Sequence, residues 1–97
     1  MERETLFNLL KSQENILHQQ FAVASLSVFG SAARNRLRKH SDIDLLVEFE
    51  RPVGLFTFIR LKLYLENLLD RRVDLVTPAA LRPELRQEIL REAIHAL

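Results

Sequence analysis

The stretch Ser41-Asp42-Ile43-Asp44-Leu45-Leu46-Val47-Glu48-Phe49 decides the fold, because it contains the clearest strand of this 97-residue chain. Apolar residues rich in strand formers run from Ile43 to Phe49 and end before the turn residues 51–54. Asp42 and Asp44 stand two positions apart at the start of this strand. Alternation therefore places both carboxylates on one face, about 6.5 Å apart along the strand.

The segment before this strand predicts a helix, a second strand and a small-residue turn. Apolar spacing over residues 3–19 is typical of an amphipathic helix. A run of strand formers predicts a strand around residues 25–29, and Gly30 ends it. Ser31 is placed to cap a short helix through Arg36, since a serine oxygen accepts from the unpaired amides of a first turn.

The segment after the turn predicts a helix over residues 55–69, a strand over residues 73–76 and a last helix that starts near Pro83. The element order predicts a single domain over residues 1–97 in the α/β (α+β) class. We expect a short mixed sheet of about three strands or slightly more, covered by helices. The last helix is expected to carry one apolar stripe, formed by Leu85, Ile89, Ala93 and Leu97.

The helix 55–69 has more apolar residues than one face of a helix can hold. Such a helix is either deeply buried or covered in part by another chain, and a small domain has little room to bury a helix all round. Both interpretations stay open from the sequence. The residues concerned are Leu55, Phe56, Phe58, Ile59, Leu61, Leu63, Leu65, Leu68 and Leu69.

Composition excludes several classes of protein. The chain has no cysteine, which excludes a disulfide scaffold and a thiolate zinc site. Its start is charged, and no apolar run approaches the ~20 residues that span a bilayer, so we expect a cytoplasmic protein without membrane contact. The net charge of +1 gives no case for direct nucleic-acid binding. One basic run stands between the turn and the aspartates, as either a solvated loop or a neighbour of bound phosphate: Arg34, Arg36, Arg38, Lys39 and His40.

Three carboxylates and one turn carry the chemistry that the sequence suggests. Asp42 and Asp44 repel each other and attract a hard cation, and Mg²⁺ prefers carboxylate and phosphate oxygens. Asp74, the one acid of the strand 73–76, can share their face if the two strands are neighbours. Three acids can hold two metal ions around a phosphoryl displacement, and Asp74 can also act as a general base.

The turn supplies the groups that bind phosphate. Gly30 lets the backbone approach a phosphate closely, and amides at a helix start point at an anion. The Ser31 hydroxyl adds a donor, and Arg34 can reach a triphosphate with its planar guanidinium group. Ser41 can cap or hydrogen-bond the turn before the strand. Each feature alone is weak, whereas their joint spacing is rare by chance.

With these motifs, the chain resembles the minimal nucleotidyltransferases of the DNA polymerase β superfamily. The resemblance is carried by Phe29-Gly30-Ser31-Ala32-Ala33-Arg34, Ser41–Val47 and Val73-Asp74-Leu75-Val76, and runs from about residue 23 to the C-terminus. Many members have glycine after the arginine, where this chain has Asn35, a residue that tolerates positive φ.

The resemblance implies both site roles and a partner. Gly30 and Ser31 would contact the triphosphate of ATP, and Asp42, Asp44 and Asp74 would bind Mg²⁺, two ions in all. Minimal nucleotidyltransferases are often antitoxins of HEPN ribonuclease toxins, and some transfer AMP from ATP to a toxin tyrosine. A hetero-oligomer with such a toxin is therefore expected.

The alternative is a non-catalytic antitoxin that neutralises its partner by complex formation alone. A binding-only protein is free to lose clustered carboxylates, which cost stability without a metal. The complete set of Gly30, Ser31 and the three aspartates favours the enzyme.

Overall fold

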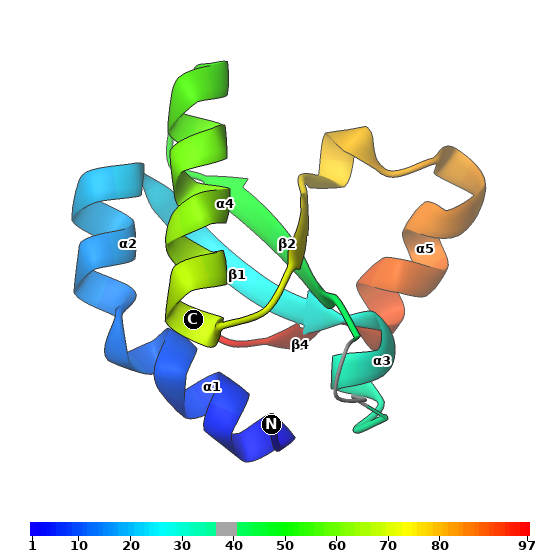
Figure 1. Cartoon of the computed structure of the whole chain (residues 1–97). Coiled ribbons are helices and arrows are strands. Elements are labelled where there is room, and N and C mark those ends of the chain that lie inside the picture. The colour runs from blue at the N-terminus through cyan, green and yellow to red at the C-terminus, as the bar shows by residue number, and fades with distance from the viewer. Residues whose placement is uncertain (37–40) are drawn as a thin grey trace.

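The computed structural model describes residues 1–36 and 41–97, in which a four-stranded mixed sheet is covered by helices (Figure 1). The strands are β1 (Val23–Phe29), β2 (Ile43–Phe49), β3 (Val73–Val76) and β4 (Ile94–His95), in the order β3-β2-β1-β4. β2 is antiparallel to β1 and parallel to β3, and β4 is antiparallel to β1. The predicted α+β class with a small mixed sheet is confirmed.

Three helices cover one face of the sheet: α1 (Arg3–Ser12), α2 (Glu14–Phe21) and α4 (Leu55–Leu69). α4 connects β2 to β3, because two parallel neighbouring strands need a crossover. Alternate residues of the strands point toward these helices and form the core. The core includes Leu6, Leu10, Leu17, Leu26, Val28, Ile43, Leu45, Val47, Leu61, Leu65, Leu69, Val73 and Leu75.

The helix expected over residues 3–19 is wrong as a single helix, because the chain breaks at Gln13 into α1 and α2. Gln13 has φ −104° and ψ 13°, outside the helical region. The Ser12 hydroxyl donates to the carbonyl of Leu9 at 2.6 Å, a local bond that competes with helix continuation. The Tyr64 hydroxyl of α4 donates to the Gln13 side chain, which fixes the break against α4.

The apolar stripe expected for the last helix is also wrong, because α5 (Pro83–Glu92) ends before Ala93 and has no buried residue. Leu85 is exposed on α5. The chain after the helix instead joins the sheet as β4, where the Leu26 amide donates to the Leu97 carbonyl at 3.0 Å. This pairing buries Leu97 in the main core.

The bounds of α4 match the sequence prediction, but deep burial of this helix is wrong. Leu61, Leu65 and Leu69 are buried, whereas Leu55, Phe56, Ile59 and Leu63 are exposed on the opposite side. This exposed side leaves room for the alternative, that another chain covers part of α4. Among the helices in the described part of the chain, none has the length and apolar character needed to cross a membrane.

A smaller apolar cluster lies on the other face of the sheet. Phe29 and Leu46 pack there with Leu81, which follows the 3₁₀ helix η1 (Pro78–Ala80). Ile89 of α5 packs against this cluster. The cluster covers only part of the second face, and Asp44 and Asp74 lie on that face beside it.

Candidate functional site

Gly30 begins the short helix α3 (Gly30–Ala33) in a conformation that only glycine adopts without strain. Its φ is +67°, in the left-handed region. β1 and β2 pair Phe29 with Asp44, so Gly30 lies beside the Asp44 side chain. A Cβ built on Gly30 would clash with the Asp44 carboxyl group and stand 3.0 Å from its Cγ. The turn therefore needs glycine both for its backbone and for the room that Asp44 occupies.

The parallel pairing of β2 with β3 brings two of the predicted acids together. Asp44 and Asp74 are direct partners in the register, so both side chains lie on the same face of neighbouring strands. Asp44 is half-buried, and Asp74, which is exposed, lies close enough to act on it electrostatically. Asp42 is exposed just before β2 and close enough to act on Asp44 electrostatically.

The Asp44 carboxyl group holds its proton more tightly than an ordinary aspartate. Its pKa is raised to about 6, chiefly by burial and then by the negative charges of Asp74 and Asp42. The hydrogen bond from Asp74 adds to this effect, and the Arg34 guanidinium opposes it. Three carboxyl groups and one guanidinium thus form one electrostatic cluster.

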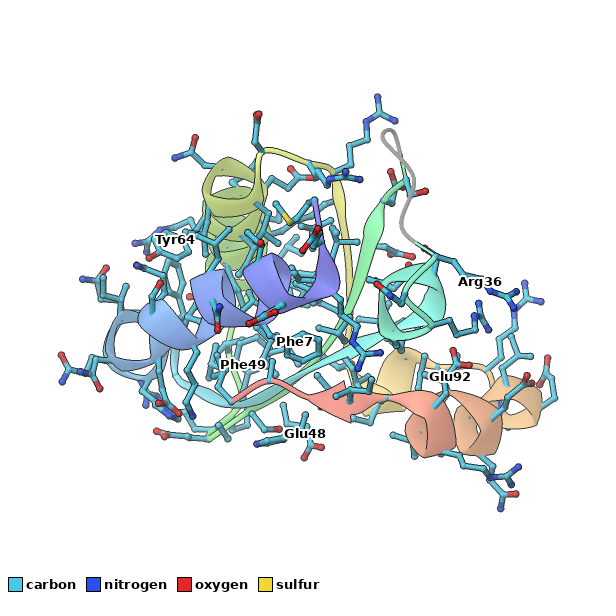
Figure 2. The ribbon with its side chains drawn as sticks, turned by 90° about the horizontal axis from the view of Figure 1, so that it is seen from below. Phe7, Arg36, Glu48, Phe49, Tyr64 and Glu92 are labelled. Atoms are coloured by element: carbon cyan, nitrogen blue, oxygen red, sulfur yellow. The ribbon has the colours of Figure 1, made fainter. Side chains whose placement is uncertain are left out.

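The turn and Arg34 are joined by a residue that no sequence pattern marked, Glu92 at the end of α5; Figure 2 labels Glu92 on this helix. The Gly30 amide donates to Glu92 Oε1 at 3.1 Å, and Arg34 Nη1 donates to Glu92 Oε2 at 3.2 Å. One carboxylate therefore accepts a hydrogen bond from the first amide of α3 and also orients the arginine. No sequence pattern links Glu92 to a turn that lies 62 residues earlier.

Ser31 does not cap a helix, and that prediction is wrong. α3 ends at Ala33 instead of Arg36, its N-terminal cap residue is Phe29, and no side chain caps it. The Ser31 side chain is half-exposed on the first turn of α3, next to Gly30. Asn35 has φ +56°, as its place in the motif suggested. Arg38, Lys39 and His40 of the basic run lie outside the described residues.

Ser41 stands at the entrance to β2, where its carbonyl accepts from Arg71 Nη1 at 3.2 Å. An open depression of about 400 Å³ lies nearby, at the start of β3. Both acids and bases line it, which is an environment for a charged ligand. Its lining is formed by Asp42, Lys62, Glu66, Arg72, Val73 and Asp74.

The donor set fits a hard divalent cation. Its ligand atoms are carboxylate oxygens only, and the missing side chain of Gly30 leaves the room in which the Asp44 carboxyl group sits. Within residues 1–36 and 41–97, no three His, Cys, Asp or Glu side chains already stand in a metal-holding arrangement. Asp44 and Asp74 instead face each other on neighbouring strands, and the negative charges of Asp74 and Asp42 disfavour ionisation of Asp44. A bound cation would offset the repulsion between these carboxylates.

The raised pKa of Asp44 predicts a stability that depends on pH. Because the native pKa lies above the ordinary value of 3.8, this group stabilises the fold below about pH 4, and that contribution is lost as pH rises through about 6. Asp44→Asn keeps the size and shape of the side chain without the charge. At pH 8 without metal we expect Tm to rise by roughly 4–8 °C, which corresponds to about 1 kcal/mol after discounting for solvent screening.

Thermal unfolding at pH 5 and pH 8 measures this effect. The gain of Asp44→Asn should shrink at pH 5, and Mg²⁺ at pH 8 should raise the Tm of the wild type alone. A wild type that is more stable than the variant at pH 8 without metal would contradict the account of charge repulsion.

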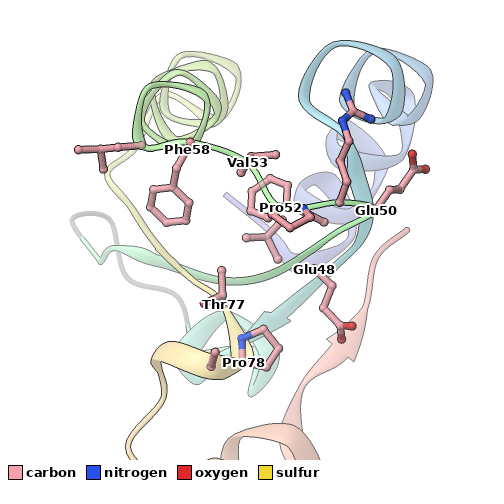
Figure 3. Close-up of a pocket in the computed structure, with 13 residues that line it drawn as sticks. Glu48, Glu50, Pro52, Val53, Phe58, Thr77 and Pro78 are labelled. Atoms are coloured by element: carbon pink, nitrogen blue, oxygen red, sulfur yellow. The ribbon is translucent and has the colours of Figure 1, made fainter.

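An apolar pocket lies apart from this cluster, at the other end of β2 (Figure 3). It has a volume of about 740 Å³ between the start of α4 and η1. Its walls include Phe58, Pro52, Val53 and Pro78. None of the predicted site residues lines it. The pocket therefore does not belong to the carboxylate cluster.

Comparisons with known proteins show the family of the chain. The chain matches the nucleotidyltransferase domain family over residues 10–95. It is 38% identical over 92 residues to the protein adenylyltransferase MntA of Thermococcus cleftensis, covering 95% of this chain and 93% of that protein.

Solved structures are similar over nearly the whole chain. One, described as a minimal nucleotidyltransferase, superposes with a TM-score of 0.82 at 45% identity and covers 97% of this chain and 95% of the other. A complex of a tri-AMPylated HEPN toxin with its MNT antitoxin from Shewanella oneidensis has a TM-score of 0.65 at 20% identity, over 94% and 71% of the two chains. This second likeness concerns the fold alone. The family match, the close relatives and the pairing of Asp44 with Asp74 beside Gly30 together establish that the chain belongs to the nucleotidyltransferase family and is an enzyme of that class.

Proposed function

We propose that this protein transfers AMP from ATP to a hydroxyl group, that of a tyrosine, on a HEPN toxin, and thereby acts as its antitoxin. The observation that carries the proposal is the pairing of Asp44 with Asp74 beside the glycine turn at residue 30. The similarity to a named protein adenylyltransferase supports AMP as the transferred group. The fold shared with the antitoxin of an AMPylated HEPN toxin supports the class of acceptor.

The site residues divide between phosphate and metal. Gly30 and Ser31 would receive the triphosphate at the start of α3, with Arg34 beside them and Ser41 at the entrance to β2. Glu92 would release the Gly30 amide or share it as the phosphates approach, since it now occupies that donor.

The three aspartates form the metal-binding part of the proposal. Asp42, Asp44 and Asp74 would hold Mg²⁺, with two ions as the expected number. When bound, the metal neutralises charge on the phosphates and on the leaving group. Without it, the carboxylates would repel the triphosphate.

The transfer balances as a displacement at phosphorus. The acceptor oxygen forms a bond to the α-phosphorus of ATP, and the bond from that phosphorus to the oxygen that bridges to the β-phosphate breaks. Pyrophosphate leaves with the electron pair. The proton of the acceptor hydroxyl passes to Asp74, which is exposed and can release it to water.

The proposal places the enzyme in a hetero-oligomer with its toxin, in the cytoplasm where ATP is present. It needs neither a membrane nor direct contact with nucleic acid. The acceptor is proposed to arrive on a separate protein, in line with the fold shared with the antitoxin of an AMPylated HEPN toxin.

Intact-mass spectrometry of a HEPN partner, after incubation with this protein, ATP and Mg²⁺, tests the proposal. We expect mass increases of whole AMP units on the partner and loss of its ribonuclease activity. If the partner is inhibited without any mass increase from any nucleotide, the protein is instead a non-catalytic antitoxin that works by complex formation.

A further inference from the structure

The solvent side of α4 carries an apolar stripe formed by Leu55, Phe56, Ile59 and Leu63. Their spacing places them on one side of the helix, opposite the buried Leu61 and Leu65. They are 71%, 84%, 42% and 58% exposed, and Phe56 is the most exposed large apolar residue in the described part of the chain. A continuous patch of this kind on a small protein marks an interaction site.

The stripe continues into the apolar pocket at the start of α4. Leu55 belongs to both, and Phe58 reaches into the pocket from the adjoining side of the helix (Figure 3). Pro52 and Pro78 form facing walls, so the pocket can receive a large apolar side chain. A flat stripe with a pocket at one end is suited to a helix that carries one anchor residue.

The charges beside the stripe select the partner. Arg60 and Lys62 are the charged residues of segment 55–65, which contains no acid. Arg60 lies toward α2, with its Cζ 5.8 Å from the ring centroid of Phe21, and Lys62 lies toward β3, where it lines the carboxylate depression. Cations thus border the stripe on both sides along residues 55–63, with Glu66 beyond its end, which favours a partner with acidic borders along this length.

The same charges disfavour a second copy of this chain. An antiparallel pair of α4 helices centred on Ile59 would bring the two Arg60 side chains together, and likewise the two Lys62 side chains. Like charges that face each other across an apolar contact oppose association. The partner is therefore a different protein.

The stripe also extends along α4 toward the carboxylate cluster. Leu63 is one turn or less from Lys62 and Glu66, and both of these line the depression that contains Asp42 and Asp74. A helix bound along α4 would thus end beside the carboxylates. This position is suited to a surface that holds an acceptor protein while its hydroxyl group enters the site.

We propose that the stripe and the pocket bind an amphipathic helix of the acceptor protein, with apolar residues along one face and Asp or Glu along both borders. The identification of this partner as the acceptor rests on the proposed function. The docking itself rests only on the exposed stripe, the pocket and the two cationic borders.

Two synthetic amphipathic helical peptides of about 18 residues, roughly 27 Å long, test the proposal. Both carry the same leucine face and one phenylalanine anchor, but one has Glu borders and the other Lys borders. By fluorescence anisotropy, without nucleotide, we expect the Glu peptide to bind at least about ten-fold more tightly than the Lys peptide. Arg60→Glu with Lys62→Glu should reverse this preference.

Variants of exposed residues distinguish specific binding by the stripe from non-specific hydrophobic binding. Phe56→Ser with Ile59→Ser should lower the affinity for the Glu peptide at least about ten-fold, as loss of an interface anchor does. The matched control is Leu85→Ser with Leu90→Ser, which changes two exposed leucines of α5 and should leave binding unchanged. Circular dichroism checks that all variants are folded.

Equal affinity for the Glu and Lys peptides would overturn the proposal. So would an equal loss of Glu-peptide affinity in the α5 control variant. It would also be overturned if the protein alone sediments as a dimer that Ile59→Ser dissociates. Because the assay contains no ATP, its outcome does not depend on transfer. Peptide binding without AMP transfer to any partner would keep the docking surface and remove the proposed enzyme activity.

Discussion

Replacing Asp42 and Asp44 together by alanine is expected to abolish AMP transfer, with a loss of at least about 1,000-fold in rate. The reason is that metal ions supply several kcal/mol of charge stabilisation in such a displacement, and each 1.4 kcal/mol is a factor of ten. The fold should remain, because Asp42 is exposed and removing clustered negative charge relieves the repulsion that raises the pKa of Asp44. Tm without metal should equal or exceed that of the wild type.

Transfer of label from ATP to the partner measures this loss. The matched control is Glu88→Ala, which removes an exposed carboxylate of α5 that lines neither the carboxylate depression nor the apolar pocket. Its activity should stay close to that of the wild type. Residual transfer by the double variant at the wild-type rate would refute the assignment of these acids as metal ligands.

Gly30→Ala is expected to reduce transfer by at least about 100-fold and to lower stability by about 1–2 kcal/mol. The stability cost comes from placing a Cβ in the left-handed region, at φ +67°. The activity cost comes from the Asp44 carboxyl group, whose Cγ would stand 3.0 Å from the new carbon and must move. A displacement of about 1 Å at a reacting centre can cost two orders of magnitude.

Gly54→Ala is the matched control for this substitution. Gly54 precedes α4 with φ −77°, and a Cβ there would meet no atom within 4 Å. We expect unchanged activity and stability for Gly54→Ala in the same transfer and unfolding assays. If Gly30→Ala behaves like this control, the close packing of turn and carboxylate has no role in the reaction.

The central elements could be predicted from the sequence because their patterns are long and unmixed. β2, α4 and β3 have the predicted bounds, since each is an apolar run limited by turn residues or a proline. The sequence predicted that Asp44 and Asp74 share a face only on the condition that their strands are neighbours. The structure makes them parallel partners in direct register.

The ends of the chain could not be predicted in the same way. β4 has two residues, too few for an alternating pattern, and its pairing with β1 depends on residues nearly 70 positions apart in sequence. Gln13 breaks a helix inside a sequence with helical spacing, because contacts with α4 outweigh local propensity. Glu92 reaches Gly30 only through the tertiary fold, so no local motif marks it.

The measurement that tests the central claim most directly compares ATP labelled at the α-phosphate with ATP labelled at the γ-phosphate, in the presence of Mg²⁺ and a HEPN partner. If the cluster of Gly30, Asp44 and Asp74 directs attack on the α-phosphorus, the partner acquires the α-label and pyrophosphate carries the γ-label away. Labelling of the partner from the γ-phosphate alone, or from neither position, would contradict nucleotidyl transfer by this site.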